Sequence, residues 1–251
     1  MNEEILTAPV TSIDTGAKAV VLIPVMYHTE PEMEETLAAC VSKFGRDKVR
    51  RRSITRTTIW TARDILAHAF LTEYDAEYAI FIDGDQVLPT GAKDGLITRV
   101  RSQTPIRPDQ AMFNFIERML NHDPKYGVIG AAYFDRQNGV SLQVSMGVGA
   151  YEVNGFNDRY RKGQVRGIMN CEWVATGGMR IHRRVFAKIK ANSARFPEIV
   201  PSDPARPWGY FTPNRVNLGE DVAFCARANL SGEKIWFDAD LRILHKAVIF
   251  N

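Results

Sequence analysis

Two aspartates flank a glycine directly after an apolar run, in the stretch YAIFIDGDQVLP of residues 78–89. In an extended backbone, residues two apart point to the same side, so Asp83 and Asp85 can present both carboxylates to one point. Gly84 lets a ligand approach the backbone closely. Two like charges need a positive partner, and Mg²⁺ or Mn²⁺, which prefer oxygen ligands, fit that role. Asp-Gly is also typical of a tight turn, which leaves a structural interpretation open.

An arginine near the start of a helix is a second chemical signal. We expect a helix over residues 58–73 with Thr61 as its N-cap, which would place Arg63 in the first turn. The helix dipole disfavours a cation there, so Arg63 indicates an anionic partner. Asp64, the next residue, could instead supply a structural ion pair.

Consecutive glycines and a pair of acids complete the set. Gly177 and Gly178 follow a short apolar run, and without side chains they let backbone amides approach a ligand, or they make a tight turn into a helix. Glu220 and Asp221 begin a helix expected over residues 220–229, where the dipole stabilises acidic side chains. One of the two could serve as a general base in a cleft.

The elements that must position these residues alternate between strand and helix over the first 85 residues. The expected strands cover residues 19–27, 49–55 and 78–82, and the expected helices cover 31–45 and 58–73. This order favours a doubly wound, Rossmann-like half, in which ligands bind at the carboxyl ends of the strands.

The second half is expected to contain mixed or antiparallel strands, a helix over residues 110–121 and a closing strand over 234–245. That strand ends in His245, which gains functional weight only if the strand returns beside Asp85. Residues 195–218 contain five prolines and no periodicity, a pattern typical of a lid or binding loop, and we expect this segment to close over substrate.

Composition limits the class of protein. The chain has 251 residues and a net charge of +3, below what a dedicated nucleic-acid binder usually carries. Basic segments at 48–56 and 159–166 could contact phosphates of a nucleotide or a polymer, or could be the solvated edge of a sheet. Three widely spaced cysteines without a CxxC pair favour a reducing compartment, and neither a signal core nor a membrane span is evident, so we expect a cytoplasmic protein.

The order of the motifs resembles a known family. A strand ending in Pro24 is followed by Ala-Arg-Asp at 62–64, FIDGD at 81–85, ATGGM at 175–179, GED at 219–221 and a late histidine. Together, across roughly residues 19–246, they resemble a GT-A-fold glycosyltransferase of the family 2 type, with FIDGD as its DxD motif. The resemblance implies one α/β domain with a mixed sheet over 19–251 after an extension of residues 1–18. Residues 19–90 would form the Rossmann-like nucleotide-binding half and residues 91–251 the acceptor-binding half.

The resemblance also implies a role for each matching residue. The donor nucleotide and sugar would be bound by Pro24, Tyr27, Arg63, Asp83, Gly84, Asp85, Gly177 and Gly178. The metal, Mn²⁺ or Mg²⁺, would bridge the diphosphate and be held by Asp83, Asp85 and His245. Asp221, with Glu220 beside it, would take the proton from the acceptor hydroxyl.

The expected function is therefore metal-dependent transfer of a single sugar from a nucleotide-diphosphate sugar, with a UDP-sugar favoured, to a hydroxyl acceptor with inversion. No QxxRW motif follows the acidic pair, so synthesis of a long polymer is not expected. A retaining transferase, an enzyme acting on a hydroxylated base in DNA, and a non-catalytic sugar- or nucleotide-binding module stay open as alternatives. A nucleotidyltransferase would need a glycine-rich basic signature near the first strand, where this chain has MYHTEPEME. Lipid-linked and saccharide acceptors are equally compatible with the sequence.

Overall fold

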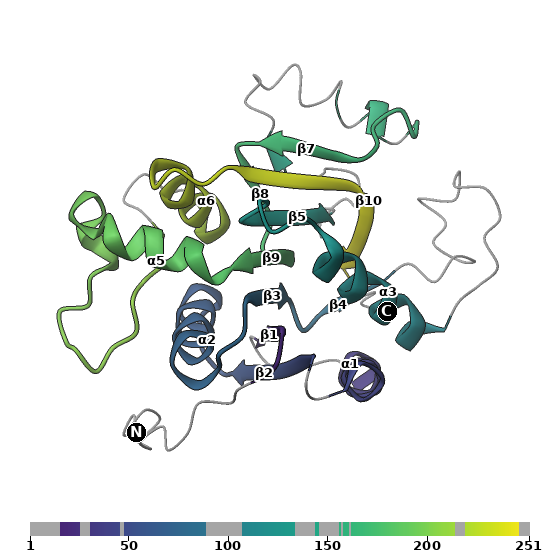
Figure 1. Cartoon of the computed structure of the whole chain (residues 1–251), viewed down its shortest axis with the longest axis horizontal. Coiled ribbons are helices and arrows are strands. Elements are labelled where there is room, and N and C mark those ends of the chain that lie inside the picture. The colour runs from purple at the N-terminus through teal and green to yellow at the C-terminus, as the bar shows by residue number, and fades with distance from the viewer. Residues whose placement is uncertain are drawn as a thin grey trace, which may run out of the picture.

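A mixed β-sheet lies between two layers of helices in the computed structural model (Figure 1). The structure describes residues 16–25, 31–45, 48–88, 107–133, 144–145, 156, 158–160, 162–213 and 219–245. One face of the sheet is covered by α2 (Ile59–Glu73), α5 (Arg183–Ala191) and α6 (Glu220–Leu230). The other face is covered by α1 (Pro31–Phe44) and α3 (Pro108–Asn121).

The first half of the sheet is parallel. β1 (Ala19–Val25) lies between β2 (Val49–Thr55) and β3 (Tyr78–Ile82), and α1 and α2 provide the connections. Alternate side chains of β1 enter the two separate cores, with Val20 and Leu22 on the α2 side and Val21 and Ile23 on the α1 side. A strand buried on both faces reads as a continuous apolar run, which explains the sequence of β1. The Rossmann-like half is confirmed.

The second half mixes strand directions. β9 (Gly178–His182) pairs antiparallel with β3 and with β5 (Val128–Tyr133). β10 (Ile235–His245) runs parallel to β5 and antiparallel to β7 (Ile168–Cys171), and its end pairs antiparallel with β4 (Gln86–Val87). β6 (Val144–Ser145) and β8 (Trp173–Val174) form a small separate sheet. The predicted fold class, one α/β domain with a mixed sheet, is confirmed.

The sheet has two ends that differ in chemistry, and we name them after β3. At the carboxyl end β3 finishes and β9 begins, because Ile82 pairs with Gly178. At the amino end β3 begins and β9 finishes, because Tyr78 pairs with His182. The connections at each end determine which side chains can meet there.

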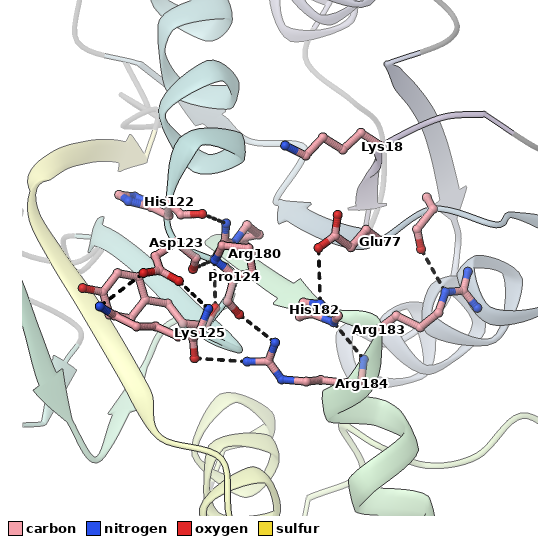
Figure 2. Close-up of polar contacts among 12 residues, drawn as sticks. Lys18, Glu77, His122, Asp123, Pro124, Lys125, Arg180, His182, Arg183 and Arg184 are labelled. Atoms are coloured by element: carbon pink, nitrogen blue, oxygen red, sulfur yellow. Dashed lines mark hydrogen bonds and ion pairs between the residues drawn. The ribbon is translucent and has the colours of Figure 1, made fainter.

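Arginines bind the amino end together (Figure 2). The fully buried Arg180 donates hydrogen bonds of 2.8–3.2 Å to backbone carbonyl groups in and just after the last turn of α3, those of Met119, His122, Asp123 and Tyr126. Arg183 does the same for the end of α2, at Phe70, Leu71, Tyr74 and Ala76. Arg184 reaches Pro124 and Lys125. Because the last carbonyls of a helix lack intrahelical partners, these arginines satisfy groups that would otherwise be orphaned.

The start of α2 differs from the prediction. The helix begins at Ile59 with Thr58 in the N-cap position, so the prediction of Thr61 as N-cap is wrong. Thr58 donates its hydroxyl hydrogen to the Thr61 hydroxyl at 2.7 Å instead. Arg63 consequently lies in the second turn of α2, where the dipole opposes a cation less strongly.

The proline-rich segment also differs from the prediction. Two 3₁₀ turns, Ser193–Arg195 and Pro197–Ile199, lead into it, and its apolar side chains enter the core beneath α5 and α6. The buried members are Phe196, Ile199, Tyr210 and Phe211. The segment is thus anchored in the core at these positions, whereas residues 202–206 are exposed. Closure of this segment over substrate stays a prediction.

No helix in the described ranges is both long and apolar enough to cross a membrane. The three cysteines, Cys40, Cys171 and Cys225, are buried free thiols.

Candidate functional site

Most of the predicted site residues meet at the carboxyl end of the sheet. Asp83 directly follows β3, and Gly177 directly precedes β9, so the pairing of these two strands places them side by side. The backbone N–H of Gly84 donates to the carbonyl oxygen of Pro24 at 3.3 Å, which holds the Asp-Gly-Asp turn against the end of β1. In open α/β sheets, ligands bind outside the carboxyl ends of the strands.

Arg63 is the centre of this site. Its Nη2 lies 2.9 Å from Asp83 Oδ1, and its Nη1 lies 2.5 Å from Glu220 Oε1 and 3.1 Å from Asp221 Oδ1. The Arg63 side chain is only 3% exposed. Burial opposes its positive charge, but the three carboxylates outweigh that cost and raise the pKa of Arg63 above its ordinary value. One guanidinium therefore links α2, the turn after β3 and the start of α6; we call these four side chains the Arg63 cluster.

Asp221 has the environment of a tuned carboxylate. It accepts hydrogen bonds from Arg63 and from the buried hydroxyl of Thr176, and its side chain is 24% exposed. Desolvation raises the pKa of Asp221 to about 6, against the lowering effect of Arg63, while Glu220 adds to the rise. A carboxylate with such a pKa is largely ionised at neutral pH and can still accept a proton.

The charges of the Arg63 cluster do not balance. Three carboxylates surround a single guanidinium, so the cluster carries excess negative charge when all three are ionised. Asp85, in the same turn as Asp83, adds another acid to this end of the sheet. Such an excess, beside partly exposed oxygens, favours binding of a cation or of a ligand that brings one.

The sequence did not identify Gln86, which the structure places at the floor of the site. It is 1% exposed, and neither its amide nitrogen nor its amide oxygen has a hydrogen-bond partner among the residues that the structure describes. A Cβ on Gly177 would overlap the Gln86 amide and the Tyr133 ring and would lie 3.1 Å from Asp83 Oδ2. Gly177 thus allows these groups to crowd together, and an unpaired buried amide calls for a partner that is not a described protein group.

The other predicted residues have mixed outcomes. A Cβ added at Gly178 would lie 3.0–3.4 Å from atoms of Ile243, Ala131 and Phe115, so the side of this glycine that lacks a side chain faces the core. His245 pairs through its backbone with Gln86, so the closing strand does return beside Asp85. The His245 side chain and all of Tyr27 lie outside the described residues.

The donor set of the expected metal can be tested against this geometry. Among the described residues, no three His, Cys, Asp or Glu side chains gather in an arrangement that would hold a metal. One oxygen of Asp83 is engaged by Arg63, whereas Oδ2 lies on the Gly177 side. Two aspartates one residue apart, the excess negative charge and the unpaired Gln86 amide nevertheless match the oxygen-rich surroundings that Mg²⁺ and Mn²⁺ prefer. These residues fit a divalent cation.

Arginines of both basic segments pair with acidic side chains. β2 forms a lateral edge of the sheet, and its Arg51 and Arg52 pair with Glu34 and Glu73. Arg166 pairs with Asp240 at 3.4 Å. This arrangement matches a charged edge strand, one of the two interpretations that the sequence allowed.

Comparison with known proteins gives a similarity of fold. No family model matches the chain, and no curated protein matches it. Among solved structures, the crystal structure of A197 from STIV is similar with a TM-score of 0.51 and 15% identity, over 91% of this chain and 85% of that one. A structure of GalNAc-T7 with UDP, GalNAc and Mn²⁺ gives a TM-score of 0.41 and 11% identity, over 97% of this chain and 44% of that one, and we draw no conclusion from it. The chain thus shares its α/β fold with A197 from STIV, and its mixed sheet is consistent with a Rossmann-like GT-A architecture.

Proposed function

We propose that the protein is a metal-dependent glycosyltransferase that moves one sugar from a nucleotide-diphosphate sugar to a hydroxyl acceptor with inversion. The Arg63 cluster is the observation that supports this most. It gathers a base candidate, two further acids and a buried cation where ligands bind in sheets of this kind.

Asp221 is the proposed general base. Its carboxylate is partly open to solvent, and contacts with Arg63 and Thr176 fix its orientation. A pKa of about 6 keeps it ionised at neutral pH and basic enough to take the proton from an acceptor hydroxyl. Glu220 shares Arg63 with it and raises its basicity by its own negative charge.

The donor is proposed to lie along the turn after β3. Asp83, Asp85 and His245 would hold Mn²⁺ or Mg²⁺, and a bound metal supplies neutralisation of the charge that develops on the departing diphosphate. The nucleotide, with UDP favoured, would lie against the half formed by residues 19–90, and the acceptor against residues 91–251. The other residues proposed to border the donor are Pro24, Tyr27, Arg63, Gly84, Gly177 and Gly178.

Calorimetric titration tests the donor site. UDP, GDP, CDP and dTDP are titrated in turn with Mn²⁺ and again with EDTA, into the wild type and into Asp85→Ala. The control is Asp75→Ala, because Asp75 is an exposed acid that precedes β3 at the amino end as Asp85 follows it at the carboxyl end. We expect metal-dependent binding of one nucleotide, weakened about tenfold or more in Asp85→Ala and retained in the control. If no nucleotide shows metal-dependent binding, the proposal is wrong.

Product analysis tests the reaction. Sugar transfer from the donor that binds, followed by determination of the product anomer, separates inversion from retention. Nucleotide-sugar binding without transfer to saccharide, lipid-linked or hydroxylated-DNA acceptors would instead support the non-catalytic sugar- or nucleotide-binding module. An acceptor of DNA would also make binding fall steeply with salt.

A further inference from the structure

We infer that Tyr210, Phe211 and Thr212, here called the positioning block, hold the three elements of the Arg63 cluster at the separation that the site requires. Asp64 and Phe211 are then positioning residues for the proposed reaction, and their effect on catalysis rests on the proposed function. The contacts that support the inference come from α2, α6 and β3 in turn.

The first contact is with α2. Asp64, 5% exposed and next to Arg63, accepts a hydrogen bond from the Phe211 backbone N–H at 2.7 Å and another from the Thr212 hydroxyl at 3.1 Å. Two adjacent residues of α2 thus have different partners. Arg63 contacts the carboxylates of the site, and Asp64 contacts the positioning block. A displacement of α2 at this turn would disturb both.

The second contact is with α6. Arg227, 3% exposed, donates to the carbonyl oxygens of Tyr210 at 2.9 Å and Thr212 at 2.5 Å. The Phe211 ring stacks on Phe224 with centroids 4.5 Å apart and planes 12° apart. Phe224 lies one helical turn after Asp221, so the positioning block packs against α6 close to the proposed base.

The third contact is with β3. The Phe211 ring meets Phe81 edge to face with centroids 5.1 Å apart, and Phe81 precedes Asp83 by two residues. One fully buried ring and its backbone therefore touch α2, α6 and β3. These are the same three elements that carry Arg63, Asp221 and Asp83.

This coincidence distinguishes the block from ordinary core packing. The ion pairs of Arg63 with Asp83, Glu220 and Asp221 span 2.5–3.1 Å, so a shift of about 1 Å in any one element would break one of them. Functional groups of this kind need a supporting layer that fixes them to within about 0.5 Å. Loosening the block should alter the proton affinity of Asp221 and the rate of transfer, and it should leave donor affinity nearly unchanged.

The test compares three variants. Asp64→Leu removes both acceptors, whereas in Asp64→Asn the amide oxygen still accepts from the Phe211 N–H and the amide NH₂ can donate to the Thr212 hydroxyl. Asp238→Leu is the matched control, because Asp238 is another buried, paired carboxylate, held by Arg118 and His122 away from the three elements. The readouts are the NMR titration midpoint of the Asp221 carboxyl carbon, and kcat and KM for sugar transfer.

We expect Asp64→Leu to move the Asp221 midpoint by about half a pH unit or more. It should lower kcat about tenfold or more with little change in KM, because a misplaced group costs rate and not donor binding. Asp64→Asn should restore both values, and Asp238→Leu should lower thermal stability while moving neither. Equal midpoints and equal kcat in Asp64→Leu and Asp238→Leu would overturn the inference.

Two additions keep the result decisive. If Asp64→Leu does not fold, Phe211→Leu, which keeps apolar volume but loses the stacking on Phe224, is measured in the same way. The NMR midpoint does not depend on transfer, so a shifted midpoint in a protein without transferase activity would refute the proposed function and retain the positioning block. Sugar transfer by the wild type, together with an unshifted Asp221 midpoint in the variants, would retain the proposed function and refute the positioning block.

Discussion

Both ends of the sheet are organised by arginines, but the partners of those arginines differ. At the amino end, the buried Arg180 and the partly buried Arg183 donate to backbone carbonyl groups in and just after the last turns of α3 and α2 (Figure 2). At the carboxyl end, Arg63 donates to three carboxylates. Backbone carbonyl groups do not titrate and are fixed in position by the fold, whereas side-chain carboxylates can gain protons, bind cations or change partners. The amino end is therefore built for stability, and the carboxyl end keeps groups that can respond to a ligand.

Buried side-chain atoms without a hydrogen-bond partner among the described residues occur at both ends, with Arg180 Nε at the amino end and both polar atoms of the Gln86 amide at the carboxyl end. The two ends differ instead in charge, because negative charge exceeds positive charge in the Arg63 cluster. In α/β proteins, functional residues generally lie at the carboxyl ends of the strands, and residues at the opposite end contribute to stability. The variants below test whether it holds here, because each changes one end and is read at both.

Asp221→Asn should give the largest change, at the carboxyl end only. Removing the proposed base lowers kcat by about 10²–10⁴-fold, since an amide cannot take the acceptor proton. Stability should stay the same or rise slightly, because the substitution removes a carboxylate whose pKa is already raised by desolvation. Initial rates and chemical denaturation measure the two effects. A variant that retains a third of the wild-type rate would exclude Asp221 as the base.

Arg180→Met should show the opposite pattern. The substitution removes the Arg180 donors from four backbone carbonyl groups, two of them in buried hydrogen bonds, and should cost about 3 kcal/mol or more of unfolding free energy. Burial lowers the pKa of Arg180 to about 10, so it stays charged between pH 5 and 8 and the loss should not vary with pH there. Nucleotide affinity of the folded variant should match that of the wild type. A tenfold loss of affinity would mean that the two ends are not independent.

Arg63→Met should produce a smaller loss that depends on pH. Without the guanidinium, the carboxylates of Asp83, Glu220 and Asp221 repel one another, which destabilises the fold by about 2 kcal/mol at pH 7. Protonation relieves the repulsion, so stability relative to wild type should recover as the pH falls towards 5. Denaturation midpoints at several pH values measure this recovery, and a deficit that is constant with pH would place Arg63 in the same class as Arg180.

The last expected effect is a dependence of the stability of the wild-type protein on pH. Desolvation raises the pKa of Asp64 to about 7 and that of Asp221 to about 6, both above the value in an unfolded chain. The folded state therefore binds these protons more tightly, and the stability they contribute is present below about pH 4 and is lost as the pH rises to about 7. Each of the two groups should contribute a slope of about 1.4 kcal/mol per pH unit between its unfolded and its folded pKa, and Asp64→Asn should remove the contribution of Asp64. An equally steep slope in Asp64→Asn would show that Asp64 titrates normally.

Local pattern predicted most of the fold. β3 and the helix that begins at Glu220 appear where continuous apolar character and an acidic first turn indicate them. The sites at which prediction failed depend on pairings between distant residues. Burial of Gln86 follows from the register of β4 with the end of β10, which no local periodicity encodes. The convergence of Arg63 with Asp221 likewise needs α2 and α6 to meet on one face of the sheet.

The core contacts of the proline-rich segment could not be predicted for a different reason. Its prolines and polar residues dominate the local pattern and suggest a loop, yet aromatic side chains between them supply the core contacts. Phe211 has no periodic neighbour to mark it, because residues 210–212 form no helix or strand. Asp64, which the sequence allowed as an ion-pair partner of Arg63, binds the Phe211 backbone instead.

The pairing of His245 with Gln86 has a consequence for biosynthesis. It joins the turn after β3 to the last strand across more than half of the chain, a contact that must wait until the ribosome has made β10. Vectorial folding can form the parallel half early, since β1 pairs only with β2 and β3, and all three strands lie within the first 82 residues. The turn that carries Asp83 and Asp85 receives its strand partner last, so a nascent chain holds no finished site until synthesis has passed residue 245.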